Sequence, residues 1–416
     1  MSNYQGMLAV DYEDRIDFPR LRRERIERTV KAMREQKVDA LILQRAANVR
    51  YTTGARTMVE DAPREYQIPA ISVVFGDGRP PYLFTAEPDG VPPGMLKDHV
   101  LPPFVTEYRE GVKQMGEVLR RILGDAARGR IGVDDLSPAM YELLPEELPG
   151  STLVDAARPL REARKIKTPD EIECLKVAQQ INEAVMFEVV KHIKPGVREM
   201  DLTSFFLKRM VELGISANHV DPIFRVAPTR AADVDWPYED DPPLAQLTSD
   251  RILREGDSLI IDTGLFYNGY CSDFGRTWWV GRHSRPSAKQ KDLYRRWREV
   301  YNNISEVLQP GKTLADVNLA ARKMSGKTGT SKPWCKALYV AHGIGCGVSA
   351  EQPFVGTDMG MEYEREWVLQ PGMVMILEPV IFEEGVGMYR AEESIVITPK
   401  GFERFTNFPH GAFAED

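Results

Sequence analysis

The stretch IIDTGLFYNGYCSDFGRTWW, residues 260–279, decides the fold of this 416-residue chain. Asn268 and Gly269 stand between two apolar runs, and Asn-Gly in that position is the strongest short signal for a two-residue β-turn. If these two residues form the turn, Tyr267 pairs with Tyr270 and the flanking runs form two antiparallel strands. The sequence therefore predicts a β-hairpin here.

The predicted register brings two aspartates to one face of the hairpin. It places Asp262 opposite Gly275 and Gly264 opposite Asp273. Because side chains alternate between faces along a strand, both aspartates share a face, roughly 7–8 Å apart at the backbone. Their carboxylates can converge on one point, although an aspartate in a strand is also commonly a turn, cap or ion-pair residue.

A second hairpin follows near the C-terminus, with its turn in the sequence FEEGVGM. A turn centred there places Val380 opposite Arg390 and Glu378 opposite Glu392. Glu393 would then point to the opposite face, so Glu392 is the better partner for Glu378. This register adds two carboxylates to the same kind of arrangement.

Four carboxylates gathered in two hairpins need compensation for their charge. Either they stay protonated, or cations neutralise them. His342, in VAHGIGCG, is the obvious imidazole, although it would equally suit a hydrogen-bonded core histidine. Carboxylates with one imidazole suit a pair of divalent metals. Two such metals about 3.5–4 Å apart would hold a bridging hydroxide, the usual nucleophile of metal-assisted hydrolysis.

Composition narrows the class of protein. Apolar residues make up 43% of the chain and charged residues 28%, which is typical of a globular protein. The net charge of −8 argues against a nucleic-acid surface. We find no apolar run long enough for a membrane span and no signal peptide, so we expect no membrane partner. The four cysteines are scattered, which favours reduced thiols and a cytoplasmic location.

Two domains are expected, residues 1–162 and 163–416. Strands alternate with helices over about the first 155 residues, which is typical of an α/β domain. Thr168 before Pro169 begins a helix at the start of the second domain. In the second domain we predict a further helix at 201–213, a long irregular loop at 228–248, and four strands around one more helix near 286–307.

These motifs resemble a known family. The stretches IIDTGLFYNGYCSDFGRT, AHGIGCG, GMVMILEP and YRAEESIVIT resemble, in order, the metal-site motifs of the pita-bread superfamily, which contains creatinase, prolidase and Xaa-Pro aminopeptidase. The first 160 residues resemble the creatinase/prolidase N-terminal domain. The resemblance implies an α/β (α+β) fold with a pita-bread catalytic domain. It also implies a homodimer, in which Tyr51 and Arg56 would reach the partner subunit's site.

The resemblance further implies the roles of individual residues. Two divalent metal ions (Mn, Fe, Co or Zn) would be held by Asp262, Asp273, His342, Glu378 and Glu392. In that family pattern Asp273 and Glu392 bridge the two metals. The residues implied to be catalytic are Glu378, which takes part in proton transfer, and His342.

Three departures from the peptidase pattern concern the substrate side of the site. Gly275 stands where the family usually has threonine. Ser349-Ala350 precedes Glu-Gln-Pro where peptidases carry a second histidine, and this segment is one residue longer. The loop with Trp236-Pro237-Tyr238 lacks the peptidases' upstream histidine. The metal ligands are therefore complete while the substrate surroundings differ.

The leading prediction is a dinuclear-metal-dependent hydrolase of the Xaa-Pro peptidase or prolidase type, acting on a short peptide or small molecule. The alternative is a non-peptidase member of the superfamily: a metal-dependent lyase similar to the dimethylsulfoniopropionate lyases, or a hydrolase, acting on a small cationic substrate. Trp236 and Tyr238 are candidate substrate-binding residues, since aromatic faces attract cations. Arg390 is the third candidate substrate-binding residue. Arg276 and Arg390 flank the ligand strands and would also suit a role orienting the carboxylates. A non-enzymatic binding module is a third alternative, which five retained ligand types disfavour.

Overall fold

The chain forms two compact units. The computed structural model describes residues 15–57, 68–215, 217–234, 246–281, 285–323, 340–356 and 360–410. One unit is Ile16–Asp170, and the other comprises Glu171–Asp416 with the residues up to Arg15. The domain division that we predict after residue 162 stays a prediction. No helix in the described ranges combines the length and the apolar character needed to cross a membrane.

The Ile16–Asp170 unit is built on a six-stranded mixed sheet in the order β4-β3-β2-β1-β5-β6. Its strands are β1 (Ala40–Leu43), β2 (Ile71–Phe75), β3 (Tyr82–Phe84), β4 (Val100–Leu101), β5 (Arg130–Val133) and β6 (Thr152–Asp155). Its helices are α1 (Phe18–Glu35), α2 (Ala46–Thr53), α3 (Arg109–Leu123), α4 (Pro138–Glu147) and α5 (Ala157–Arg164), with short 3-10 turns η2 (Pro88–Gly90), η3 (Lys97–His99) and η4 (Gly124–Arg128).

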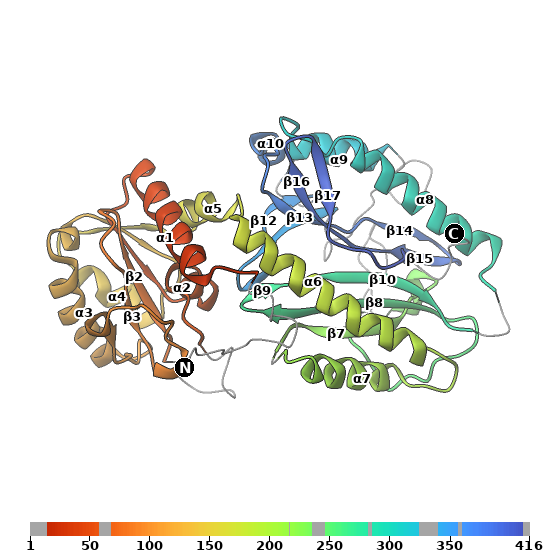
Figure 1. The fold of residues 1–416 in the computed structure, drawn as a ribbon, viewed down its shortest axis with the longest axis horizontal. Coiled ribbons are helices and arrows are strands. Elements are labelled where there is room, and N and C mark those ends of the chain that lie inside the picture. Colours follow the sequence, from red (N-terminus) through yellow and green to blue (C-terminus); the bar gives the residue numbers. More distant parts are fainter. Residues whose placement is uncertain are drawn as a thin grey trace. The chain divides into compact units, whose positions relative to one another are not determined.

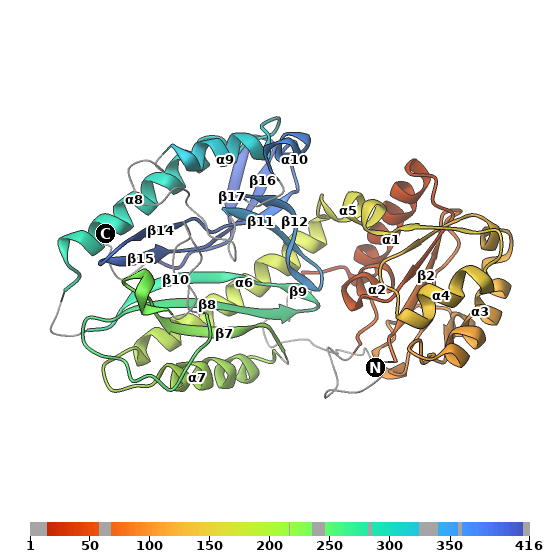
Figure 2. The same cartoon turned by 180° about the vertical axis from the view of Figure 1, so that it is seen from behind.

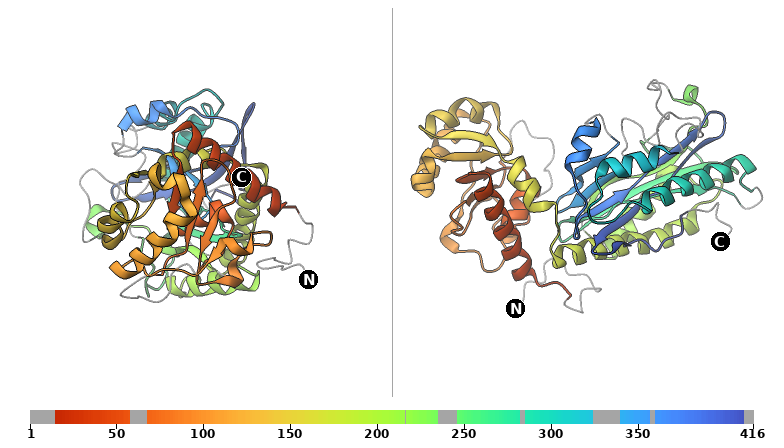
Figure 3. Two further views of the ribbon diagram at one scale, coloured as in Figure 1. Left: turned by 90° about the vertical axis from the view of Figure 1, so that its left-hand side faces the viewer. Right: turned by 90° about the horizontal axis from the view of Figure 1, so that it is seen from above.

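Helices cover both faces of this sheet (Figures 1 and 3). Ile42 of β1 packs in a cluster with α3 and α4, while its neighbour Leu41 packs in a second cluster with α1 and α5. This alternation follows from the opposite directions of successive side chains in a strand. The predicted α/β architecture of the N-terminal part is confirmed.

The described residues of the second unit form three sheets. One holds β7 (Asn218–Val226), β8 (Ser258–Tyr267), β9 (Tyr270–Cys271) and β10 (Phe274–Trp279); a second holds β11 (Ala341–Gly345), β12 (Val348–Val355), β13 (Val374–Leu377), β16 (Glu393–Thr398) and β17 (Gly401–Arg404); the third is β14 (Val380–Glu383) with β15 (Gly387–Arg390). The helices are α6 (Pro169–Val189), α7 (Glu199–Glu212), α8 (Ala288–Ser305), α9 (Leu314–Arg322) and α10 (Gly360–Glu366), with 3-10 turns η5 (Val190–His192) and η6 (Ala231–Asp233).

The helices of this unit enclose its strands. Helix α6 crosses in front of the strands in Figure 1 and behind them in Figure 2, so it covers one face. Helix α8 packs on β14 and β15, α9 on β12, and α7 on β7. We predicted one helix after residue 286, but the described residues hold three there. The capping box of Thr313 with Asp316 is the signal for α9 that the prediction missed.

The first hairpin forms in the predicted register. Tyr267 pairs with Tyr270, and Asp262 pairs with Gly275. Asn268 and Gly269 have φ of 49° and 82°, both left-handed. A two-residue I′ turn requires positive φ at both central positions, and these residue types adopt it at least cost.

The second hairpin also has its predicted register. Val380 pairs with Arg390 in the β14–β15 sheet, and the neighbouring β13–β16 ladder continues in the same register. Glu378 and Glu392 thus lie opposite each other in the gap between the two sheets. Pro379, which lacks an N–H, sits in this gap, where the ladder is interrupted.

The prediction that Tyr51 reaches a partner subunit's site is wrong. Its side chain is fully buried, and its hydroxyl donates to the carbonyl of Ala163 at 2.9 Å. The guanidinium groups of Arg25 and Arg164 lie near its ring, at 5.3 and 5.1 Å from the centroid. Arg56 is exposed.

Candidate metal centre

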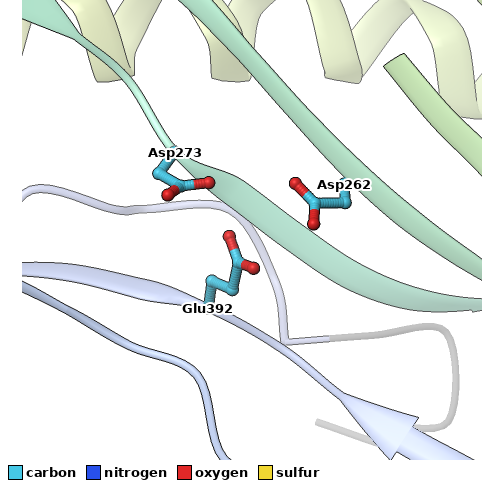
Figure 4. Close-up of side chains that lie close together, drawn as sticks. All are labelled: Asp262, Asp273 and Glu392. Carbon is cyan, nitrogen blue, oxygen red and sulfur yellow. The ribbon is translucent and has the colours of Figure 1, made fainter. Parts of the chain in front are cut away.

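Three carboxylates from three segments converge in the second unit. Asp262 lies on β8, Asp273 on the link between β9 and β10, and Glu392 on the link between β15 and β16. One oxygen atom of each lies within 4.8 Å of the other two. Figure 4 shows the three carboxylates pointing toward one another. Their exposed fractions are only 8%, 8% and 1%, so water screens their mutual repulsion poorly.

His342 and Glu378 adjoin this cluster. Nδ1 of His342 donates to the carbonyl of Gly343 at 2.8 Å, which fixes the ring tautomer. Its Nε2 then faces Oε1 of Glu378 at 3.1 Å and Oδ2 of Asp273 at 3.5 Å. In a neutral ring held this way Nε2 is an acceptor, and it faces two further acceptors. A proton or a metal cation must lie between them.

Burial and neighbouring charges shift the pKa values of four of these five residues. Burial raises the pKa of Asp273 well above its ordinary value, and the charge of Glu392 adds to this. Burial likewise raises the pKa of Glu392 to about 8, with Arg390 opposing. Burial also acts to raise the pKa of Glu378, but Arg390 and His342 outweigh it and the pKa is lowered. Burial acts to lower the pKa of His342, but its hydrogen bond to Glu378 raises it overall.

Arg390 supplies positive charge inside the cluster. Its Nη1 lies 2.8 Å from Oδ2 of Asp262, and its Nη2 lies 2.6 Å from Oε2 of Glu378 and touches Glu392. Thr277 fixes its main chain, because the hydroxyl donates to the Arg390 carbonyl at 2.7 Å and accepts from its N–H at 2.9 Å. Arg390 thus lies against the carboxylates, as expected of an orienting residue, and its role in binding substrate stays a prediction.

One arginine does not complete the bonding of this cluster. Neither carboxylate oxygen of Glu392 has a hydrogen bond of normal geometry, although both are buried. Such atoms are costly unless another cation or proton reaches them. Carboxylate oxygens with one imidazole nitrogen are a donor set that suits divalent transition metals. The residues present therefore fit a metal centre.

Two supporting residues were not predicted from the sequence. Oε1 of Gln179, on α6, accepts from the N–H of Asp273 at 3.3 Å and from the hydroxyl of Ser394 at 3.3 Å. Thr277 holds Arg390, as described above. Gln179 is 1% exposed. A polar residue on the buried face of a helix is the only sequence signal that would have revealed it.

The longer segment after His342, one of the three departures from the peptidase pattern, lies in strands β11 and β12. The extra length after His342 is taken up by register shifts between β11 and β12. A bulge of this kind re-aims side chains near functional sites. The side chain of Glu351 lies against Gly345. A Cβ added to Gly345 would lie 2.4 Å from Oε1 of Glu351. Trp236 and Tyr238 lie outside the described residues.

This fold, with its buried carboxylates and imidazole, defines a metal-dependent hydrolase of the pita-bread superfamily. Residues 173–399 match the family model for metallopeptidase family M24, and residues 25–166 match that for the creatinase/prolidase N-terminal domain. The chain belongs to metallopeptidase family M24.

The relatives cover from two thirds to more than nine tenths of the chain. The Xaa-Pro dipeptidase of Pyrococcus furiosus is 26% identical over 384 residues, which are 92% of this chain and 98% of that protein. A probable dipeptidase PepE of Mycobacterium bovis is 30% identical over 281 residues, 67% of this chain and 68% of that protein. The crystal structure of the prolidase from Pyrococcus horikoshii OT3 matches with a TM-score of 0.72 at 22% identity, covering 93% of this chain and 99% of that one. The last of these shows a shared fold.

Proposed function

We propose that this chain is a dinuclear-metal-dependent hydrolase of the Xaa-Pro dipeptidase type, which cleaves short peptides ending in proline. The observation that carries the proposal is the position of Asp273. It belongs to the convergent group with Asp262 and Glu392, and its Oδ2 also lies 3.5 Å from Nε2 of His342. A carboxylate shared between two donor groups is what a two-metal site needs. The dipeptidase names of the relatives support the same substrate class.

When bound, two divalent metals would lower the pKa of a water molecule and polarise the substrate carbonyl. Glu378 is the proton carrier among the chain's own residues. Its lowered pKa keeps it ionised, so an oxygen of its carboxylate can accept a proton from the attacking water and deliver it to the leaving nitrogen. Arg390 orients this carboxylate through its 2.6 Å contact. The burial of both groups excludes bulk water from the transfer.

A metal-dependent lyase acting on a small cationic substrate is the second candidate. Ser349-Ala350 and the histidine-free stretch Trp236-Pro237-Tyr238 support it, because the peptidases carry a substrate-binding histidine at both places. The loss of a donor aimed at developing negative charge raises the free-energy barrier to amide hydrolysis by about 3–4 kcal/mol. A lyase would not need those donors in the same positions.

Dipeptide assays separate the two candidates. Purified protein is first loaded with Mn²⁺, Co²⁺, Fe²⁺ or Zn²⁺, and its metal content is measured. We expect turnover of Ala-Pro and Gly-Pro, with Ala-Ala as the control that lacks proline. No turnover of either proline dipeptide by metal-loaded protein would reject the dipeptidase proposal. Release of dimethyl sulfide from dimethylsulfoniopropionate would then support the lyase. The predicted homodimer is tested separately by light scattering.

A further inference from the structure

The hydrogen bonds of Arg276 reach none of the carboxylate groups of Asp262, Asp273 and Glu392, yet every donor that it carries is used. It lies on β10 and is fully buried. Its neighbours Gly275 and Thr277 face the cluster, so its own side chain points to the opposite face of the strand. A guanidinium has five N–H donors, and all five here meet oxygen atoms. The acceptors are the carbonyls of Gly275, Glu392, Phe408 and Pro409 and the carboxylate of Glu393.

Two of these acceptors are the main chain of the site itself. The N–H of Glu392 donates to the carbonyl of Gly275 at 2.9 Å, and Nη1 of Arg276 donates to the carbonyls of both residues. Arg276 therefore ties the backbone from which the Glu392 carboxylate projects to the neighbouring strand β10. Glu393, fully buried, supplies the opposite charge at 3.1 Å.

The other two carbonyl acceptors belong to residues 405–410, the segment that follows strand β17. This segment has its own ties to the unit. The N–H of Asn407 donates to the Glu183 carboxylate at 3.0 Å, and the Tyr389 hydroxyl donates to the His410 carbonyl. The ring of Phe408 packs against that of Phe274 with centroids 5.2 Å apart. The segment thus presents the Phe408 and Pro409 carbonyls to Arg276 from a fixed position.

We propose that Arg276 is a positioning residue for Glu392 and that residues 405–410 form part of the metal centre by holding Arg276 in place. The proposal rests on the metal site of the proposed function. A planar guanidinium reaches four carbonyls and a carboxylate at once, whereas an ammonium group has three donors on one nitrogen. Loss of the guanidinium would free the Glu392 backbone while leaving all five candidate ligands present.

Mn²⁺ affinity, measured by calorimetry on full-length protein, tests the role of Arg276. We expect Arg276→Ala to weaken Mn²⁺ binding by about tenfold or more, as the loss of groups that orient metal ligands does. Arg276→Lys, which keeps the charge, should bind with intermediate affinity. Arg225→Ala is the matched control, because Arg225 pairs with the fully buried Glu199 at 3.0 Å away from the carboxylates. The control should lose stability and keep its Mn²⁺ affinity.

Truncation tests the segment independently. A chain that ends at Arg404 should bind Mn²⁺ as weakly as Arg276→Ala, and combining the two changes should weaken binding no further, because both remove one linked support. A chain that ends at His410 keeps every contact described above and should bind as the wild type does.

The outcomes are distinguishable. Wild-type affinity in Arg276→Ala, or an equal loss of affinity in Arg225→Ala, would overturn the proposal. If Arg276→Ala does not fold, wild-type affinity in Arg276→Lys has the same meaning, since the proposal requires the fork of donors. Wild-type protein that binds no Mn²⁺ would instead refute the metal centre on which the proposal rests.

Discussion

Gly275 and Glu392 occupy adjoining space that cannot hold a larger residue at position 275. A Cβ added to Gly275 would lie 2.5 Å from Cδ of Glu392 and 2.6 Å from its Cγ. The backbone of Gly275 pairs regularly with Asp262 in the β8–β10 ladder. Because Gly275 has no side chain, Glu392 can approach this strand closely. The family usually has threonine at this position, so Gly275 is a departure that bears directly on Glu392.

Gly275→Ala should weaken metal binding by displacing Glu392. Real Cβ atoms do not approach to 2.5 Å, so the glutamate must move, and the other ligands would remain. We expect about a tenfold loss of Mn²⁺ affinity, as for other perturbations of ligand orientation. Gly132→Ala is the control, because its Cβ would meet Leu41 at the same 2.5 Å, in the other unit. Equal Mn²⁺ affinity in Gly275→Ala and the wild type would contradict this account.

Asp273→Asn should strongly weaken the binding of both metals without unfolding the protein. The substitution removes the carboxylate that the two donor groups share, and we expect affinity to fall by about 100-fold. The metal-free protein should be at least as stable as the wild type, because repulsion with Glu392 is relieved. Metal content and thermal unfolding measure the two effects. Asp233→Asn changes the charge equally near the exposed Arg230 and should leave metal content unchanged. A variant that still holds two metals would disprove the shared role.

Arg390→Ala should destabilise the metal-free protein far more than the metal-loaded protein. Removing one partner of a buried ion pair costs about 3–5 kcal/mol, because the remaining charge stays buried. Bound metal would supply cations to Asp262 and Glu378 in its place. Thermal unfolding with and without Mn²⁺ measures the difference. Arg251→Ala breaks a more exposed pair with Asp257 and should change stability by less than about 1 kcal/mol. An equal loss with and without metal would show that Arg390 has no electrostatic role in the cluster.

The geometry of the site could be predicted where it depends on local rules. Asn268-Gly269 set the turn, and the alternation of side chains then placed Asp262 and Asp273 on one face. The relation of Glu378 to Glu392 followed from the same rules. An orienting role for Arg276 could be predicted from its place beside the ligand strand, but the support of Gln179 and the four distant acceptors of Arg276 could not, because these contacts join segments far apart in the chain. Local periodicity carries no information on which distant carbonyl a buried donor will meet.

Tyr51 shows a different limit. Its sequence position suggested an exposed recognition residue, but its hydroxyl and ring are both satisfied inside the unit. Short motifs do not distinguish a buried aromatic residue from an exposed one, since tyrosine is intermediate in burial and suits either place. The candidate metal-binding carboxylates were less ambiguous, because two hairpin registers each brought a pair of them together.

Glu183→Gln should change how stability depends on pH. Glu183 is 5% exposed and accepts from the N–H of Asn407, and burial raises its pKa from 4.5 to about 7. The folded state therefore binds this proton more tightly than the unfolded state does. Stability from the protonated group is fully present below pH 4.5 and is lost as the pH rises through about 7. Glutamine cannot ionise, so the variant should lack this loss.

Urea unfolding of metal-free wild type and Glu183→Gln at several pH values measures the difference. Between about pH 5 and pH 8 we expect the wild type to lose on the order of 2 kcal/mol relative to the variant. Titration of Glu392 and Asp273 affects both proteins equally and cancels in the comparison. Glu188→Gln is the control on the same helix, since Glu188 is paired with Lys191 at 2.9 Å near the surface and its pKa is lowered. A difference between wild type and Glu183→Gln that does not vary with pH would show that this carboxyl group is ionised throughout.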